Sequence, residues 1–321
     1  MSMRSRRRPV APSPRHAVPS VIFARCGILS LGNTQMAIEI RPVKTEDEYH
    51  AVERLQREIW GAQDIEIIAF ETLMTAHKNG GVMLGAFDLV EGEERMVGFV
   101  FGFAGLTADC RVKHCSHIAG ALPGYRDRGV GYALKLKQRE IVMAQGMDLI
   151  TWTFDPLESR NARFNFHKLG ATCDVYLRNL YGAMRDKLNA GLPSDRFQVD
   201  WRIASPRVEA RLRGETEVSS VSALMAEGVP LANRTVEGEL LLPSEETMIE
   251  GKRILIQIPS DFQNLKAADR NLALEWRLHT RALFEEAFAK GYETTDLLVE
   301  GGQSYYLLER LADIRSAAGQ R

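Results

Sequence analysis

Alternating apolar and polar stretches divide the first hundred residues into short strands and amphipathic helices. Thr45 precedes an acidic first turn and a series of apolar residues at helical spacing, which is typical of a capped helix. Asn79-Gly80-Gly81 is a stop signal for a second helix, and Glu91-Gly92-Glu93-Glu94 predicts a hairpin turn. The pattern therefore predicts a strand at 38–40, a helix from Thr45 through Trp60, a helical stretch at 67–77, and strands at 82–87 and 96–101.

A glycine-containing loop connects the next two elements. The pattern predicts a strand at 115–122, the loop Arg126-Asp127-Arg128-Gly129-Val130-Gly131, a helix at about 129–145, a strand at 149–154, a helix at about 160–168 that stops at Gly170, and strands at 173–181 and 197–203. A strand, loop, helix and strand in this order form a crossover, so the strands at 115–122 and 149–154 should be parallel neighbours. The sequence thus predicts one mixed α/β domain that ends near residue 205.

The remainder of the chain predicts a polar linker and a smaller α/β unit. Residues 206–250 are glutamate-rich and weakly patterned, with room for one helix and one strand. A strand at 253–259, a helix with Trp276, Phe284 and Phe288 on one side, and strands at 295–299 and 305–308 follow. These elements resemble a degenerate half-repeat of the first domain without its glycine loop. We therefore expect a first α/β domain at 36–205, a linker at 206–250 and a C-terminal half-domain at 251–321.

The first 35 residues differ in composition from the rest. They contain six arginines and recurrent prolines but no acidic residue, so they cannot form a core. A targeting peptide or a nucleic-acid arm would also be basic. Because Met36 directly precedes a strand-like stretch, we expect residues 1–35 to be a disordered or non-native extension.

Composition narrows the class of protein and of partner. The 321 residues carry 41 basic and 42 acidic side chains, and this balance gives no overall attraction to nucleic acid or anionic lipid. No apolar run approaches the roughly 18 residues of a membrane span. The four cysteines, Cys26, Cys110, Cys115 and Cys173, are irregularly spaced, which favours free thiols in a reducing cytosol. We expect a cytoplasmic protein that acts on a small molecule and can form a homodimer.

The glycine loop predicts an anion site, because a loop that opens a helix presents backbone N–H groups at the positive end of the helix dipole. A P-loop would need Lys and then Ser or Thr after its second glycine, where the chain has Val130-Gly131. A dinucleotide fingerprint would need glycine at position 134, which is Leu134. The P-loop is therefore excluded, and a nicotinamide dinucleotide site is not expected.

Arg126, Gly129 and Gly131 instead match the pattern R/Q-x-x-G-x-G/A, and with this motif the chain resembles the GNAT (Gcn5-related N-acetyltransferase) superfamily. The order of elements over residues 37 to about 205 supports the resemblance. The stretches Trp152-Thr153-Phe154-Asp155-Pro156-Leu157, Asn161-Ala162-Arg163-Phe164-Asn165 and Ile258-Pro259-Ser260-Asp261-Phe262 look like a bacterial branch with a C-terminal extension. That branch is similar to proteins suspected of N-acylating amino acids.

The resemblance implies a site for acetyl-CoA or another acyl-CoA. The cofactor pyrophosphate would lie on the amides of Asp127 to Gly131, and Arg126 and Arg128 could add positive charge, although Arg128 could equally be a solvated surface residue. The strand that ends at Ala121 and Leu122 is implied to part from the strand at 149–154, which leaves backbone groups for the pantetheine amides. The amide of Leu122 would polarise the thioester carbonyl. Asn161 would contact pantetheine, or would simply face the short helix.

Acyl transfer by direct attack needs a base for the amine and an acid for the leaving thiolate. The family usually supplies the acid as a tyrosine four residues before the glycine that ends the short helix, but this chain has Phe166 there. His167, Tyr176, Tyr181 or Asp155 would have to replace it, or solvent would protonate the thiolate. The choice among these groups stays open.

His117 is the candidate base, because it lies on the strand that leads to the loop and an ordinary histidine titrates near neutral pH. The alternative is a histidine packed in the sheet. A zinc site built from Cys110, His114, Cys115 and His117 is not expected, since a strand alternates faces and these four side chains cannot converge. No metal is therefore predicted.

The sequence thus predicts an acyl-CoA-dependent N-acyltransferase, most simply an N-acetyltransferase, that acts on the amine of a small molecule. Three alternatives stay open: an N-succinyltransferase of amino acids, a non-catalytic acyl-CoA sensor, and a protein lysine acetyltransferase. Fold-level resemblance does not choose the acceptor.

Overall fold

The structure is a computed structural model, and it describes residues 38–182, 191–217, 219–236, 242–243 and 249–310. The expected extension at 1–35 and Cys26 lie outside these residues. Cys110, Cys115 and Cys173 are free thiols, as predicted. None of the described helices is long and apolar enough to cross a membrane.

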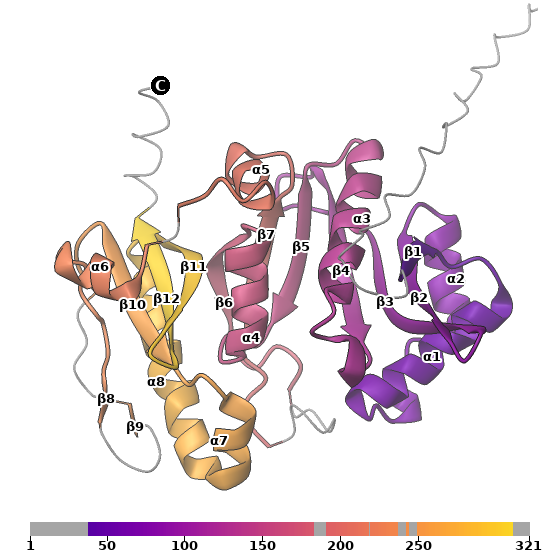
Figure 1. The fold of residues 1–321 in the computed structure, drawn as a ribbon. Helices are drawn as coiled ribbons and strands as arrows, with labels where there is room; N and C mark the ends of the chain where they lie inside the picture. Colours follow the sequence, from indigo (N-terminus) through magenta and orange to yellow (C-terminus); the bar gives the residue numbers. More distant parts are fainter. Residues whose placement is uncertain (1–37, 183–190, 218, 237–241, 244–248, 311–321) are drawn as a thin grey trace, which may run out of the picture. The chain divides into compact units, whose positions relative to one another are not determined.

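The N-terminal half follows the predicted order of elements (Figure 1). Its elements are β1 (Glu39–Pro42), α1 (Glu46–Trp60), a 3₁₀ turn (Asp64–Glu66), α2 (Phe70–Lys78), β2 (Val82–Val90), β3 (Glu93–Leu106), β4 (Val112–Ala121), a 3₁₀ turn (Pro123–Tyr125), α3 (Val130–Ala144), β5 (Leu149–Phe154), α4 (Ser159–Ala162), β6 (Thr172–Leu177) and β7 (Arg196–Arg202). Thr45 caps α1 in a reciprocal capping box with Glu48. The hairpin turn is tighter than predicted, since Glu91 and Gly92 both have positive φ and β3 already begins at Glu93.

The predicted helix at 160–168 is interrupted. Only α4 is α-helical, and Arg163–Lys168 form a π-helical segment before Gly170, whose φ is 74°. A wider turn is closed by the bond from Leu169 N–H to Phe164 O, 3.1 Å. A π segment changes the faces on which following side chains point, which helical periodicity alone does not show.

The C-terminal half adds strands to the same sheet. Its elements are α5 (Pro206–Leu212), α6 (Val221–Ala226), β8 (Thr235–Val236), β9 (Leu242–Pro243), β10 (Arg253–Ile258), α7 (Phe262–Ala268), α8 (Arg270–Ala289), β11 (Tyr292–Glu300) and β12 (Gln303–Arg310). The described residues of the polar region 206–250 thus form two helices and two short strands, whereas one helix and one strand were predicted. The strand order is β1-β2-β3-β4-β5-β7-β6-β11-β12-β10, and β6 meets β11 through the single pair Cys173↔Thr294.

Apolar side chains form one large cluster that runs from β2 to β12 and crosses both expected domain boundaries. Val100, Leu134, Phe197, Trp276 and Tyr306 all belong to it. A second cluster lies on the opposite face of β2 and β3, where α1 and α2 cover the sheet. The division at residues 205 and 251, and the half-repeat, stay predictions.

The sheet opens between β4 and β5. These strands are parallel, as predicted, but they pair only at His114↔Ile150 and Cys115↔Thr151. All six residues of β5 pair with β7 on its other edge, while β4 continues along β3 as far as Ala121. The two strands therefore part beyond Cys115. The order of elements and this parting are those that the GNAT resemblance implies, so the predicted mixed α/β fold is confirmed.

We predict that Gly102→Ala destabilises the protein. A Cβ at Gly102 would lie 2.3 Å from His114 Nε2 and 2.5 Å from Cys115 O, so β4 would have to shift. Overpacking of this kind costs about 1–3 kcal/mol in the free energy of unfolding, which urea titration measures. Gly124→Ala is the control, because a Cβ there meets nothing within 4 Å. Equal stability of the two variants would contradict the close packing of β3 on His114.

Candidate functional site

The glycine loop presents unpaired amides at the start of α3. Gly129 is the N-cap residue, with φ 78° and ψ 4°, a left-handed conformation that favours glycine. Among the described residues, the N–H groups of Gly129, Val130, Gly131 and Tyr132 have no hydrogen-bond acceptor. No acidic side chain occupies the first turn of α3. The loop is therefore free to bind an anion, as the sequence predicts.

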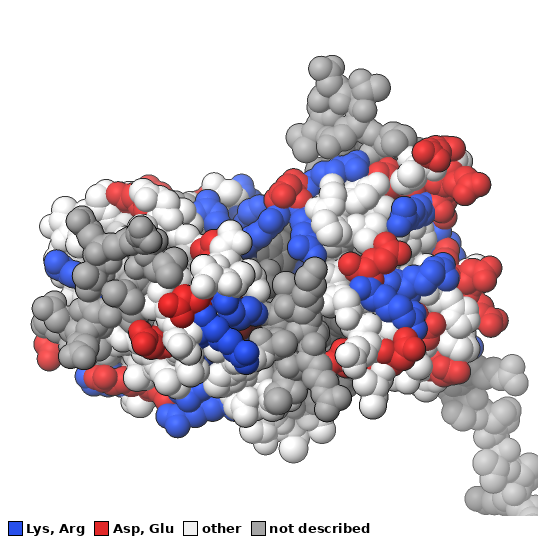
Figure 2. Space-filling model, turned by 90° about the horizontal axis from the view of Figure 1, so that it is seen from below, with Lys and Arg blue, Asp and Glu red and all other residues white. Residues whose placement is uncertain are grey.

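The charged side chains of the loop hold it in place. Arg126 donates to Ala121 O at 3.4 Å and to Ile59 O at 3.5 Å, so it ties the loop to the end of α1. Arg128 pairs with the buried carboxylate of Asp88 at 3.4 Å and lies over the ring of Tyr125, so it is not the freely solvated residue of the alternative reading. Asp127 pairs with Arg160 of α4. Figure 2 shows basic and acidic side chains interspersed over the face that it views.

The amide of Leu122 cannot have the role that the resemblance implies. Its N–H donates to Val97 O at 2.9 Å, so it completes the pairing of β4 with β3 and is not free to polarise a thioester carbonyl. Ala121 pairs with Gly98 and belongs to the core. The side chain of Asn161 is exposed and has no hydrogen bond within the described structure. A cofactor role for Ala121 and Asn161 stays a prediction.

His117 stands at a bulge in β4. Phe101 pairs with Ile118 and Gly102 pairs with Ser116, which leaves His117 without a partner residue on β3. Its ring lies against Phe101 and Phe103, on the face that α1 and α2 cover further along the sheet. Part of the His117 side chain is exposed, and desolvation by the atoms packed against its ring lowers its pKa below the ordinary 6.5, which favours the neutral imidazole at pH 7.

The structure does not bring Asp155 and His167 to His117. Asp155 directly follows β5 and accepts a hydrogen bond of 2.7 Å from Arg277 of α8. His167 lies in the π segment, and its Nδ1 is 3.0 Å from Asp296 of β11. Each of these groups already has a charged partner in the C-terminal half. Their predicted catalytic roles stay untested.

Position 166 belongs to the core. Phe166 is fully buried, and its ring contacts Phe154, Phe197 and Tyr306. Tyr176 donates to Asp195 at 2.7 Å, and burial, followed by the charge of Asp195, raises the pKa of Tyr176 well above its ordinary value. Tyr181 is exposed, and its OH lies 2.9 Å from Thr153 Oγ1 of β5. Of these two tyrosines, only Tyr181 is accessible.

A cavity of about 440 Å³ opens beside the glycine loop. Gly129 and Tyr132 line it from α3, His167 and Lys168 from the π segment, and Arg211 and Thr216 from α5 and the residues after it. Arg211 also pairs with Asp296 at 2.9 Å. Burial alone would raise the pKa of Asp296, but the hydrogen bond from His167 and the charge of Arg211 hold it below its ordinary value. The cavity thus has a basic lining next to the free amides.

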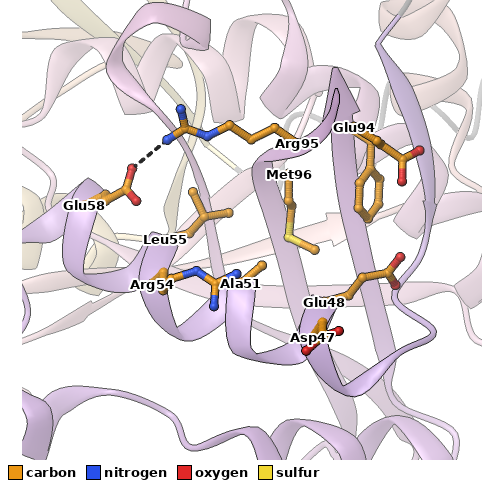
Figure 3. A pocket seen from close by; sticks show the side chains of 10 residues that line it. Asp47, Glu48, Ala51, Arg54, Leu55, Glu58, Glu94, Arg95 and Met96 are labelled. Atoms are coloured by element: carbon orange, nitrogen blue, oxygen red, sulfur yellow. Dashed lines mark hydrogen bonds and ion pairs between the residues drawn. The ribbon is translucent and has the colours of Figure 1, made fainter. Parts of the chain in front are cut away.

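A second cavity, of about 320 Å³, lies between α1 and β3. Figure 3 shows its carboxylates, Asp47, Glu48, Glu58 and Glu94, and its two arginines, Arg54 and Arg95. Arg95 pairs with Glu58 at 3.3 Å. None of the site residues predicted from the sequence lines this cavity.

Sequence reasoning missed a buried polar cluster under α3. Lys135 Nζ donates to Ser116 Oγ at 2.8 Å and to Gln138 Oε1 at 3.1 Å, and Gln138 Nε2 lies 3.1 Å from His114 Nε2. All four side chains are at most 5% exposed. Helical spacing could have indicated this cluster. Lys135 and Gln138 are three residues apart, and Gln138 and Val142 are four apart, so all three share one helix face.

No set of three His, Cys, Asp or Glu side chains in the described part of the chain could hold a metal ion. His114 points toward α3, whereas Cys115 lies beside Phe103 and Gly105 on the other face of β4.

No protein-family profile matches this chain, and no curated protein sequence matches it. Several solved structures are similar to about half of it. An acetyltransferase of the GNAT family from Streptococcus pneumoniae is 15% identical, covers 51% of this chain and 97% of its own, and has a TM-score of 0.40. The ribosomal-protein-S18-alanine N-acetyltransferase of Escherichia coli is 14% identical, with 52% and 95% covered and a TM-score of 0.39. Arabidopsis thaliana NAA60 with a bisubstrate analogue is 15% identical, with 51% and 98% covered and a TM-score of 0.40.

We predict that Asp155 and Arg277 depend on each other for stability. The Arg277 side chain is 1% exposed, and although burial would lower its pKa, the charge of Asp155 holds it above its ordinary value. Asp155→Asn should lower the free energy of unfolding by about 3 kcal/mol, because it leaves the buried guanidinium of Arg277 without its carboxylate. Arg277→Met should cost less, because Asp155 keeps a second partner in Arg196, 3.7 Å away. The double variant should lose much less than the sum, as measured by a urea double-mutant cycle. Additive losses would contradict the coupling.

Proposed function

We propose that this chain is an acyl-CoA-dependent N-acyltransferase, most simply an N-acetyltransferase, that acylates the amine of a small molecule. The observation that carries the proposal is the position of the free amides of Gly129 to Tyr132, which follow the end of β4 that lies open beyond its last pair with β5. The amides would bind the pyrophosphate, and the gap between the strands would receive the pantetheine arm. The basic cavity beside Tyr132 offers room for the remaining phosphate and the adenosine.

The transfer needs a neutral amine beside the thioester. His117 stands on the open edge of β4, and its lowered pKa keeps it able to accept a proton at pH 7. The nitrogen of the acceptor would attack the thioester carbon, and His117 would take its proton. The exposed ring of Phe103 next to His117 favours an acceptor with an apolar part over a highly charged peptide.

A non-catalytic acyl-CoA sensor is the second candidate, because Phe166 occupies the usual place of the acid and is packed in an aromatic core. Turnover separates the two functions. A thiol-release assay with acetyl-CoA and succinyl-CoA over a panel of amines, amino acids and peptides should show transfer well above the rate in buffer. Acyl-CoA binding without turnover for any acceptor would favour the sensor.

Gly131→Glu should abolish or weaken acyl-CoA binding while the protein stays folded. A Cβ at position 131 would meet nothing within 4 Å, and a carboxylate in the first turn of a helix is favourable for the helix itself. The new negative charge would repel the pyrophosphate and raise the dissociation constant at least about tenfold, which calorimetry measures. Met143→Glu, which adds the same charge at the exposed far end of α3, is the control. Unchanged binding by Gly131→Glu would exclude the loop as the cofactor site.

His117→Gln should lower kcat by about 10²-fold, because a positioned base contributes at least that much. In the wild-type protein, kcat should rise with pH through the lowered pKa of His117, below 6.5, as the imidazole loses its proton. The variant should lose this acidic limb and keep its affinity for acyl-CoA. A retained limb in the pH profile of the variant would assign it to another group.

A further inference from the structure

Lys135 is a buried amine that has no carboxylate partner in the described part of the chain. It is 5% exposed, and no carboxylate of the described residues lies within ion-pair distance of its Nζ. Lys135 Nζ donates hydrogen bonds to Ser116 Oγ and Gln138 Oε1, and it lies 3.9 Å from the centroid of the Trp152 ring. Burial of an uncompensated ammonium is costly, and an apolar residue of similar length would pack there at lower cost. Stability alone therefore does not explain why a lysine occupies position 135.

The cluster lies at the point where the sheet opens. Cys115↔Thr151 is the last pair between β4 and β5, and the next residue on each strand, Ser116 and Trp152, contacts Lys135. A pantetheine arm that starts at the glycine loop and follows β4 would pass from Ala121 to Ser116. That span is five residues, roughly 16 Å of extended chain, which is about the length of the arm. The thioester would then lie level with Lys135.

The two faces of the sheet differ at this level. Ser116 and Lys135 lie on the α3 face, whereas His117, the bulge residue, lies against Phe101 on the opposite face. A base for the attacking amine and a cation for the leaving sulfur would thus flank the reacting carbon. The role of proton donor to the sulfur is open, because the buried Phe166 stands where the resemblance implies an acid.

We propose that Lys135 donates the proton that the departing thiolate of CoA takes up, in a reaction that rests on the proposed acyl transfer. The amine nitrogen forms a bond to the thioester carbon, and the C–S bond breaks with its electron pair on sulfur. One proton of the Lys135 ammonium passes to sulfur to give free CoA, and His117 takes the proton of the amine. Solvent then restores the proton of Lys135 and removes that of His117.

The surroundings of Lys135 suit this role. Burial lowers the pKa of Lys135 to about 7, which brings proton donation into the physiological range. From β4 the titratable neighbour is His114, whose pKa burial and then the charge of Lys135 lower to about 4, so it is neutral near pH 7. Trp152 of β5 and Gln138 of α3 are uncharged.

The test is the pH dependence of kcat for Lys135→Met. In the wild-type protein, kcat should fall as the pH rises through the pKa of Lys135, because the donor is then deprotonated. The variant should lose this alkaline limb and about 10²-fold in kcat, with acyl-CoA affinity unchanged by calorimetry. Lys137→Met, on the exposed side of the same helix, should behave as the wild type. Lys135→Arg keeps the charge but cannot release a proton, so it should also lack the limb and stay slow.

Three results would overturn the proposal: an unchanged alkaline limb in Lys135→Met, a full rate in Lys135→Arg, or loss of acyl-CoA binding together with kcat. Failure of the wild-type protein to bind acyl-CoA would instead refute the proposed function.

The burial of Lys135 is checked separately, by stability measurements. Between pH 7 and 10.5 the unfolded chain binds the lysine proton more tightly, so the stability of the wild type relative to Lys135→Met should rise with pH across that window. A constant difference would show that the lysine is not buried as described.

Discussion

The structure depends on how unequally the two edges of β5 are paired. All of β5 pairs with β7, and β4 pairs with β3 along most of its length, so the parallel contact between β4 and β5 is limited to two residue pairs. Beyond Cys115 the backbone groups on the facing edges of both strands lack a strand partner. Because buried backbone groups need hydrogen bonds, this gap favours an extended ligand that supplies them. The amides at the start of α3 lie at the end of the same path.

The C-terminal half holds the far side of this gap. Tyr306 of β12 donates to Pro156 O at 2.7 Å, Ser304 and Ser159 share a hydrogen bond of 2.7 Å, and Arg277 of α8 pairs with Asp155. All three contacts reach the residues directly after β5. The C-terminal strands therefore stabilise the turn that leads into α4, and the polar groups there have structural partners. This gives Asp155 a role that does not require chemistry.

The proposed proton transfers would divide between the faces of the sheet. At the bulge, His117 has no partner residue on β3, and its ring lies against Phe101 on one face of the sheet. Lys135 of α3 contacts Ser116 on the other face. A sheet separates the two groups, so neither can neutralise the other by direct contact. In the proposed reaction the acyl group would lie between them. Phe166 can then belong entirely to the core that joins the two halves of the chain.

Local patterns in the sequence determined the order of elements, the crossover and the glycine loop, because helical and strand periodicity and the need for glycine at positive φ are properties of short segments. They also identified His117 and the absence of an acid at position 166. Only the tertiary structure decided that Leu122 N–H is already bonded, that Asp155 and His167 pair with the C-terminal half, and that Lys135 meets Ser116 and Trp152. These facts depend on strand register and on contacts between distant segments, which no local pattern contains.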